Sequence, residues 1–471
     1  MNFNAMINNE FVSTTNKLEI LNPVDNKVIG TVSALQEEDI NNAYSFAKSA
    51  QKEWANMQLM KRIEVVEKFK QEIIKNKEKI AEIMMAEIAK PLKESVAEVQ
   101  RTIDIIDFSI EEIRRFYPTA MDGKGWGIEN KIGVFERVPV GVVCAISPFN
   151  YPFNLAIAKI VPALLAGNSV VFKPATQGSL TGAFMGKMWV DSKLPKGIFN
   201  VVTGKGRDIG DIIVSNKDIN MISFTGSVNV GHRIRKMANT SNIVLELGGK
   251  DAALVLDDKN LDHYVSEIIS GSFGYAGQRC TAIKRVLTTN EIAEKLVPLL
   301  EAKIKMFKHG NPKTNPDIVP VISESSRNFI MGLVEDAKAR GGKIVTGGSF
   351  KGNLVEATLI DNVTSEMRIA WEEPFGPVLP VIRCKNVDEM ISMQNESNFG
   401  LQSSIFTTDI NLAFNIAKLI EVGTVNINSR PQRGPDNFPF LGIKDSGEGV
   451  QGIRESLNSM TRYKGIVINW K

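Results

Sequence analysis

The sequence predicts an α/β protein made of two successive units, each built on strands that alternate with helices. From residue 139 to residue 247, short apolar runs rich in β-branched residues, such as PVGVVCAIS, are separated by stretches with helical periodicity. After Gly248 and Gly249 the same alternation begins again and continues to about residue 445. Strands separated by helices of roughly ten to fifteen residues imply a parallel sheet with right-handed crossovers.

The first 117 residues come before this alternation and have a different pattern. Residues 2–34 indicate short strands joined by turns, because NPVDN is typical of a turn. Apolar residues then recur at three- and four-residue steps, which predicts three amphipathic helices over residues 37–57, 61–90 and 92–117.

Two further segments interrupt or follow the alternation. Residues 120–137 are glycine-containing and alternate in polarity, which predicts a two-stranded excursion. The last residues, SMTRYKGIVINWK, also alternate as a strand does. We expect this strand to pair either with the excursion or with another subunit.

Composition excludes several classes of function. The chain has 471 residues, a net charge of only +3 and 43% hydrophobic residues, and it has no arginine tract, so we expect no nucleic-acid partner. No apolar run is long enough to span a membrane, and the polar N-terminus does not resemble a signal peptide. The three cysteines and three histidines are widely spaced, which predicts no metal site and favours a reducing, cytoplasmic location.

Cys280 is the candidate nucleophile. It follows Arg279 in the glycine-containing stretch GSFGYAGQRCTA, and a nearby cation or backbone N–H dipoles can lower the pKa of a thiol. Glu246, in LELGGK, could serve as a general base near the same point. The alternative is a buried structural cysteine and a capping glutamate. Cys144 lies within a predicted strand, and we interpret it as structural.

Three predicted turns suggest a dinucleotide site. Lys173 ends a strand in FKPA, Gly204, Gly206 and Gly210 form a loose glycine motif, and FTGS places Gly226 and Ser227 between a strand and a helix. Ligands of doubly wound folds bind at the carboxyl ends of parallel strands, where helix N-termini favour phosphate groups. Asn150 follows another strand in SPFNYP. It could donate to an oxyanion together with the Cys280 amide, or it could simply form the turn.

SPFNYP, FKPA, FTGS, LELGGK, GQRC and EEPFGP together resemble the successive motifs of the aldehyde dehydrogenase family, over nearly the whole chain. The resemblance implies that Cys280 is the nucleophile, Glu246 the base and Asn150 part of the oxyanion hole. It also implies cofactor contacts at Lys173, Thr176, Gly206, Gly210, Gly226, Ser227, Gly248, Glu373 and Phe375.

The family fold implies a domain division. A Rossmann-type cofactor domain would comprise residues 1–119 and 138–247, and an α/β catalytic domain residues 248–445. Residues 120–137 and 446–471 would form a β-hairpin arm used for oligomerisation, with a homotetramer as the implied assembly.

A narrower resemblance, to non-phosphorylating glyceraldehyde-3-phosphate dehydrogenases, rests on four positions. In that subfamily, residues at Arg101, Tyr151, Arg279 and Arg433 surround the substrate phosphate, and several arginines suit a dianion. Arg430 remains an alternative to Arg433. The implied reaction is irreversible oxidation of glyceraldehyde 3-phosphate to 3-phosphoglycerate, and the alternative is another small aldehyde such as lactaldehyde or succinate semialdehyde.

Thr176 bears on the choice of cofactor. Members of the family that prefer NAD often carry an acidic residue three positions after the lysine of FKPA, where a carboxylate would repel a 2′-phosphate. Thr176 is neutral and can donate a hydrogen bond. We therefore expect NADP, with use of NAD also possible.

Overall fold

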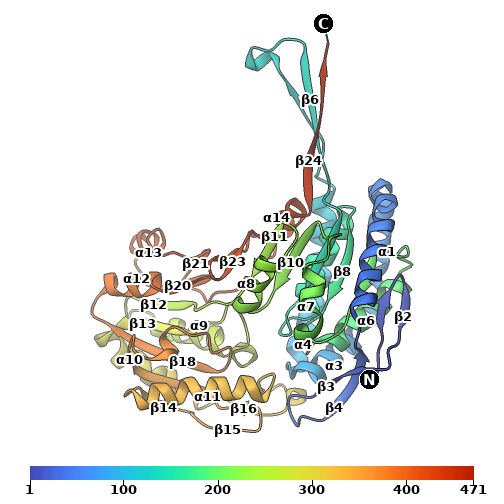
Figure 1. Cartoon of the computed structure of the whole chain (residues 1–471). Helices are drawn as coiled ribbons and strands as arrows, with labels where there is room; N and C mark the ends of the chain where they lie inside the picture. The colour runs from blue at the N-terminus through green and yellow to red at the C-terminus, as the bar shows by residue number, and fades with distance from the viewer. Residues whose placement is uncertain (471) are drawn as a thin grey trace.

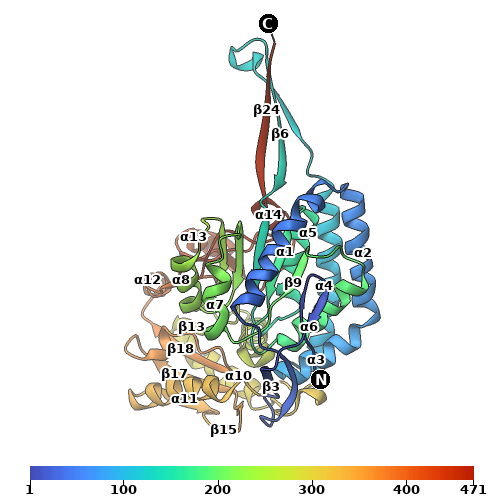
Figure 2. The ribbon, with the colours of Figure 1, turned by 45° about the vertical axis from the view of Figure 1, so that its right-hand side comes forward.

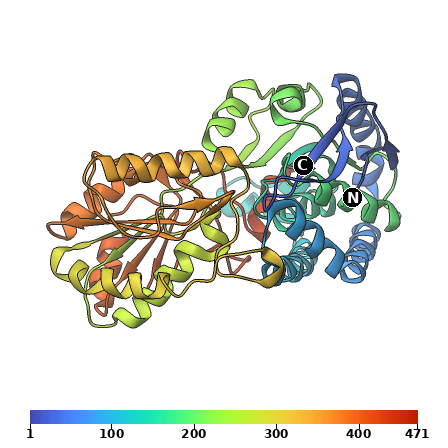
Figure 3. The same cartoon turned by 90° about the horizontal axis from the view of Figure 1, so that it is seen from below.

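Two α/β units and a projecting three-stranded arm make up the structure, a computed structural model that describes residues 1–470. The first unit (blue to green) and the second unit (yellow to red) stand beside one another, and the arm rises above them (Figure 1). Seen from below, the second unit lies to the left and the first to the right (Figure 3). No helix within residues 1–470 is both long enough and apolar enough to cross a membrane.

The first unit is built on an eight-stranded sheet whose central strands are parallel. Its strands, in order across the sheet, are β2 (Glu10–Val12), β1 (Ala5–Ile7), β9 (Phe199–Val201), β8 (Ser169–Lys173), β7 (Val142–Ile146), β10 (Met221–Thr225), β11 (Ile243–Glu246) and β23 (Gly447–Glu448). The predicted strands of this unit are therefore present and pair as expected.

Helices cover both faces of this sheet, as the alternation of β7 shows. Val143 and Ala145 belong to the core beneath α2 (Leu59–Lys75), α3 (Lys77–Ile88), α4 (Leu92–Ile113), α5 (Asn154–Leu165) and α6 (Ser179–Asp191). Cys144 and Ile146 face the opposite core, formed with α1 (Glu37–Asn56), α7 (Gly206–Val214) and α8 (Val228–Met237). Successive residues of a strand point to opposite faces, so a strand covered on both faces is apolar throughout.

The expected helix over residues 61–90 is in fact two helices, because the chain breaks at Asn76 between α2 and α3. The Asn76 side-chain amide donates to the Glu72 carbonyl at 2.8 Å. Asparagine side chains compete with the backbone for such bonds and so favour helix ends over helix interiors. The periodicity is the same on both sides of the break, which is why the apolar pattern alone did not reveal it.

The second unit is built on a seven-stranded sheet, parallel except for its first strand. Across the sheet the strands are β14 (Lys343–Thr346), β17 (Thr358–Val363), β18 (Val378–Cys384), β13 (Arg285–Thr289), β12 (Ala252–Val255), β20 (Gln402–Phe406) and β21 (Thr424–Ile427). The helices of this unit are α9 (Leu261–Phe273), α10 (Asn290–Ile304), α11 (Glu324–Ala339), α12 (Val387–Asn395) and α13 (Ile410–Ala417).

The arm consists of β5 (Thr119–Asp122), β6 (Lys131–Pro139) and the C-terminal strand β24 (Thr461–Asn469), in the order β24-β6-β5. Figure 2 shows β24 and β6 side by side along the arm. The C-terminal strand pairs antiparallel with β6 along its whole length, from Thr461 opposite Pro139 to Asn469 opposite Lys131. Between the second sheet and the arm, β23 joins the first sheet and α14 (Ile453–Ser459) packs on α4 and α5.

Short two-stranded pairs complete the fold. These are β3 (Lys17–Leu21) with β4 (Val28–Ser33), β15 (Phe350–Lys351) with β16 (Leu354–Val355), and β19 (Phe399–Gly400) with β22 (Ile443–Lys444).

Candidate active site

A cavity of about 680 Å³ opens at the carboxyl ends of the parallel strands of the first sheet. Ile146, Lys173 and Thr225 are the last residues of β7, β8 and β10, and all three line it. Every residue predicted to contact a cofactor lies on its wall: Lys173, Thr176, Gly206, Gly210, Gly226, Ser227, Gly248, Glu373 and Phe375. Asn150 and Cys280 line the same cavity.

The walls of this cavity suit an elongated anionic ligand. A side-chain carbon added to Gly206 or Gly210 would meet no atom within 4 Å, so the backbone at the start of α7 is open to approach. Ser227 precedes the first turn of α8, whose unpaired N–H groups favour phosphate. Lys173 is buried and donates to the Pro174 carbonyl at 3.0 Å, and burial lowers its pKa to about 8. A bound anion would offset that desolvation, so these residues fit a dinucleotide.

Cys280 follows a turn with an unusual backbone. Tyr275, Ala276 and Gly277 all have left-handed conformations, with φ of 50°, 51° and 71°. Such a conformation costs a non-glycine residue roughly 1–2 kcal/mol. The buried Tyr275 hydroxyl offsets part of this cost by donating to the Ile88 carbonyl at 2.7 Å. At Gly277 a Cβ atom would lie 2.3 Å from the Gly376 carbonyl oxygen, so only glycine fits. The turn is therefore tightly defined.

Asn150 lies directly against this turn. Its side-chain Nδ2 donates to the Gln278 carbonyl at 2.9 Å, and the amide has a second N–H available for a ligand. The loop that carries Asn150 is held from below by a buried ion pair, Lys90 with Glu98, at 2.5 Å. Lys90 donates to the Asn150 carbonyl at 3.2 Å, and Glu98 accepts from the backbone of Phe153. Sequence reasoning missed both charged residues.

The electrostatic setting of Cys280 opposes ionisation. The residue is partly exposed to the cavity, but surrounding protein desolvates the thiol, and burial raises its pKa to about 11. The positive charge of Lys284 acts in the opposite direction, and the carboxylates of Glu246, Asp251 and Glu373 raise the pKa further. In this structure the thiol is therefore positioned but not yet activated.

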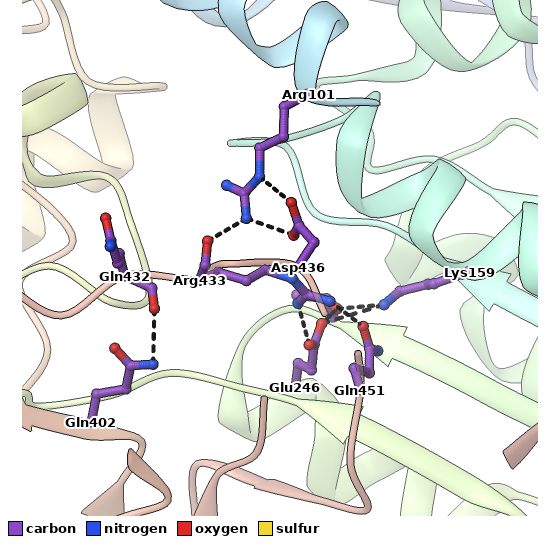
Figure 4. A network of polar contacts seen from close by, with 9 residues as sticks. Arg101, Lys159, Glu246, Gln402, Gln432, Arg433, Asp436 and Gln451 are labelled. Carbon is purple, nitrogen blue, oxygen red and sulfur yellow. Dashed lines mark hydrogen bonds and ion pairs between the residues drawn. The ribbon is translucent and has the colours of Figure 1, made fainter. Parts of the chain in front are cut away.

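Glu246, the candidate base, ends β11 and is held in a polar network (Figure 4). Its carboxylate forms an ion pair with Arg433, accepts a hydrogen bond from Thr225 Oγ1 at 2.6 Å, and lies 3.5 Å from Lys159 Nζ. Burial raises the pKa of this carboxyl, but the charges of Arg433 and Lys159 outweigh burial and lower it overall. Among residues 1–470, no hydrogen bond links Glu246 to Cys280.

Lys159 is another residue that sequence reasoning missed. It lies in the middle of α5, whose other residues are almost all apolar, and its side chain is fully buried. Its Nζ donates to Thr225 Oγ1 at 2.7 Å. A single lysine within an apolar helix was the available signal, because a buried cation requires an anionic partner.

The four predicted phosphate-binding residues each contact other groups of the protein. Arg101 forms a two-point ion pair with Asp436, at 2.8 and 2.7 Å, and also donates to the Arg433 carbonyl (Figure 4). Tyr151 lies under Lys90, whose Nζ is 3.4 Å from the ring centroid. Arg279 donates to the Gly271 carbonyl at 2.8 Å.

Arg430, the alternative to Arg433, is engaged elsewhere. Its guanidinium and its backbone N–H both bind the carboxylate of Glu267, at 3.1 Å and 2.9 Å. Arg433 instead contacts Glu246 and Gln451, the latter at 2.8 Å. All four arginines therefore have protein partners, but Arg279 Nε is buried without a hydrogen-bond acceptor and is a donor open to an incoming phosphate.

Comparison with known proteins gives a family match over nearly the whole chain. The model of the aldehyde dehydrogenase family matches residues 11–466. A relative from Streptococcus equinus, named NADP-dependent glyceraldehyde-3-phosphate dehydrogenase, is 45% identical over 98% of both chains. A protein of the same name from Arabidopsis thaliana is 47% identical over 97% of this chain and 93% of its own length.

A solved structure is also closely similar. The NADP-dependent glyceraldehyde-3-phosphate dehydrogenase of Bacillus halodurans C-125, crystallised with NADP, superimposes with a TM-score of 0.98 at 48% identity and covers 100% of both chains. With a family match over nearly its full length and relatives well above 30% identity, the chain belongs to the aldehyde dehydrogenase family.

Proposed function

We propose that the protein oxidises glyceraldehyde 3-phosphate to 3-phosphoglycerate, with NADP as the hydride acceptor and water as the second substrate. One observation carries the proposal. Cys280 and Asn150 line the same cavity as all nine residues expected to contact the cofactor, so a candidate nucleophile and a candidate oxyanion donor adjoin the candidate dinucleotide site. The two relatives, which align over nearly their full length, are both named NADP-dependent glyceraldehyde-3-phosphate dehydrogenase.

NADP fits the cavity residues better than NAD does. Lys173 and Thr176 would hold the adenosine ribose and its 2′-phosphate, Ser227 and the start of α8 the pyrophosphate, and Glu373 the second ribose. Neutral Thr176 presents no negative charge to a 2′-phosphate, and Arg207, also on the cavity wall, adds a cation that sequence reasoning missed. When bound, NADP supplies the hydride acceptor.

Acylation is the task of Cys280 and Asn150. The thiolate attacks the aldehyde carbon, and the resulting oxyanion accepts hydrogen bonds from the second N–H of the Asn150 amide and from the Cys280 backbone N–H. Loss of hydride from the same carbon leaves a thioester on Cys280. The thiol must first lose its proton, and because its pKa is raised, a positive charge near the sulfur has to favour the thiolate. The nicotinamide ring of a bound cofactor would supply such a charge, whereas the substrate phosphate would oppose the thiolate.

Deacylation is the task of Glu246. The carboxylate takes a proton from water, the resulting hydroxide attacks the thioester carbon, and the Cys280 thiolate leaves with the bonding electron pair. Glu246 is ionised in this structure, as a base must be, but it is bound to Arg433. For it to act on water beside Cys280, the contact with Arg433 has to open.

Arg101, Tyr151, Arg279 and Arg433 form the proposed phosphate site. Arg433 lies next to the Arg101 guanidinium, while Arg430 is held by Glu267, which favours Arg433 over Arg430. A dianionic phosphate could replace Asp436 on Arg101 and Glu246 on Arg433. Substrate binding would then release the base that hydrolyses the thioester.

The test is oxidation of glyceraldehyde 3-phosphate by the purified full chain, followed as NADPH formation, with NAD, lactaldehyde and succinate semialdehyde in parallel. Inorganic phosphate is omitted, because water alone should resolve the thioester. We expect the highest kcat/KM with glyceraldehyde 3-phosphate and NADP. A higher kcat/KM with either unphosphorylated aldehyde, or a requirement for inorganic phosphate, would refute the proposal.

The substrate pocket has its own test in Arg279→Leu. The variant should lose far more activity with glyceraldehyde 3-phosphate than with unphosphorylated glyceraldehyde, since only the former carries the dianion. Equal losses with both aldehydes would place Arg279 outside the phosphate site.

We further propose a cytoplasmic homotetramer assembled through the arm, acting in glycolysis without conserving ATP. The three cysteines are unpaired, which suits a reducing compartment. Large apolar residues of the arm are exposed, namely Trp126, Ile128, Ile466, Val467, Ile468 and Trp470. Light scattering should give a tetramer mass, and a monomer would exclude this role of the arm.

We also propose the domain division at residues 119, 138, 247 and 445, which limited proteolysis can test.

A further inference from the structure

Lys284 lies buried behind the nucleophile, four residues after Cys280 and just before β13. Its side chain is only 2% exposed. The ammonium group donates to the Cys280 carbonyl, lies 3.3 Å from the Ala282 carbonyl and forms an ion pair with Glu373 Oε1 at 3.2 Å. An ammonium has three N–H donors, and each has an acceptor here. No aspect of the reaction proposed above uses this residue.

The location is electrostatically unusual. The ionisable groups gathered around Cys280 and Lys284 are the carboxyls of Glu246, Asp251 and Glu373 and the cations of Lys250 and Arg285. Burial raises the pKa of Asp251 to about 7, so part of that negative charge is suppressed near neutral pH. Of the charges that act most strongly on Cys280, Lys284 favours the thiolate, while the three carboxylates oppose it.

Lys284 is also linked to the cofactor cavity, through Glu373. Glu373 lines that cavity, and its Oε1 is held jointly by Lys284 and by the Gly249 backbone N–H at 3.2 Å. The other oxygen, Oε2, turns toward Gly248 on the cavity wall. One buried cation therefore touches both the loop of the nucleophile and a carboxylate expected to hold a cofactor ribose.

We propose that Lys284 is a positioning residue that couples the two halves of the active site. Its charge stabilises the Cys280 thiolate, and its contact with Oε1 orients Glu373 toward the cofactor. The inference rests on the proposed function for the roles of Cys280 and Glu373. It differs from a purely structural role, in which Lys284 would only hold the turn together, because it predicts changes in thiol acidity as well as in stability.

The test is the pH dependence of alkylation of Cys280 by iodoacetamide in the protein without cofactor, measured by mass spectrometry of the Cys280 peptide. Cys144 and Cys384 are buried and serve as internal references. Lys284→Met removes the charge and keeps the length. We expect its alkylation profile to shift to higher pH by about one unit, equivalent to roughly tenfold slower alkylation at neutral pH. Lys284→Arg should keep most of the wild-type profile.

Glu373→Gln is the second variant and leaves Lys284 itself unchanged. Because it removes a carboxylate that opposes the thiolate, it should shift the profile to lower pH while it weakens NADP binding. Opposite shifts in Lys284→Met and Glu373→Gln support the inference. An unchanged profile in a folded Lys284→Met variant, or an upward shift or none in Glu373→Gln, overturns it, whether or not thermal stability falls.

The alkylation profile does not depend on any aldehyde, which separates this inference from the proposed function. If wild-type protein fails to oxidise glyceraldehyde 3-phosphate but the two profiles shift in opposite directions, the proposed substrate is wrong and the role of Lys284 in thiol acidity stands. If oxidation occurs and the profiles do not move, the function stands and the role of Lys284 is refuted.

Discussion

The two ionisable groups at the centre of the site, Cys280 and Glu246, lie in opposite electrostatic settings. One cation, Lys284, favours the charged form of Cys280, and the pKa of the thiol is still raised to about 11. Two cations and a hydroxyl surround Glu246, and its pKa is lowered despite burial. Desolvation alone would hold both groups neutral, so the difference comes from the neighbouring charges: cations dominate around Glu246, whereas three carboxylates oppose the single cation Lys284 at Cys280.

This difference sets the protonation states of the two groups in the site without bound ligands. The nucleophile is in place but protonated, whereas the base is ionised but bound to Arg433. Cys280 needs a positive charge that favours its thiolate, and we expect that charge on the cofactor side. Glu246 needs release from Arg433, and we expect the substrate phosphate to provide it by binding Arg433.

Removal of the nucleophile should abolish turnover and spare the cofactor site. Cys280→Ala is expected to lower kcat by at least about 10⁴-fold, because the thioester can no longer form. The remaining cavity residues are untouched, so NADP should bind within about twofold of wild type by fluorescence titration. Turnover above one hundredth of the wild-type value would mean that Cys280 is not the nucleophile.

Removal of the base should separate acylation from deacylation. Glu246→Gln is expected to retain a burst of about one NADPH per active site and then to turn over about 10²- to 10⁴-fold more slowly. Stopped-flow measurement of NADPH checks both phases. Loss of the burst with intact NADP binding would assign Glu246 to acylation instead.

Much of the cofactor side could be predicted from sequence. Lys173, Gly226 and Ser227 follow directly from local patterns, because residues at the carboxyl ends of parallel strands meet at one sheet edge whatever the rest of the chain does. The motif resemblance added Glu373 and Phe375, and both lie on the same cavity.

The base side could not be predicted in the same way. Its contacts join distant segments: Glu246 and Arg433 are 187 positions apart, and Arg101 and Asp436 are 335 apart. No local pattern encodes such pairs, since they depend on how β11, α4 and the segment before β22 come together. Lys159 and Lys284 gave only weak signals, as single lysines in apolar surroundings, and their partners became evident only in the fold.

The two arginines near the substrate site should differ in effect. Arg433→Gln is expected to lower kcat/KM for glyceraldehyde 3-phosphate by about a hundredfold, because it removes a charge-assisted contact worth roughly 1.5–3 kcal/mol and leaves Glu246 without its main counter-charge. Arg430→Gln is the matched control, and its loss should stay below about fivefold, since Arg430 is held by Glu267. The reverse ranking would give Arg430 the phosphate-binding role.

The smallest expected effect comes from Gln451→Glu, which tests how strongly the ion pair with Arg433 controls the protonation of Glu246. Gln451 Oε1 lies 2.8 Å from Arg433 Nη2, so a carboxylate there would compete with Glu246 for the same guanidinium. The weaker pairing of Glu246 with Arg433 and the new negative charge nearby would both raise the pKa of Glu246. As the pH falls, a carboxylate with a raised pKa becomes protonated, and so inactive as a base, at a higher pH. The acidic limb of the deacylation profile should therefore move upward by about half a pH unit to one unit.

At neutral pH the same variant should change kcat by less than about fivefold, because Glu246 would remain ionised while its contact with Arg433 weakens. Gln451→Ala removes the competing oxygen without adding charge, and its acidic limb should stay where it is in wild type. A downward shift in Gln451→Glu, or equal shifts in both variants, would mean that Arg433 does not set the protonation of the base. Lys159, rather than Arg433, would then be the cation that keeps Glu246 ionised.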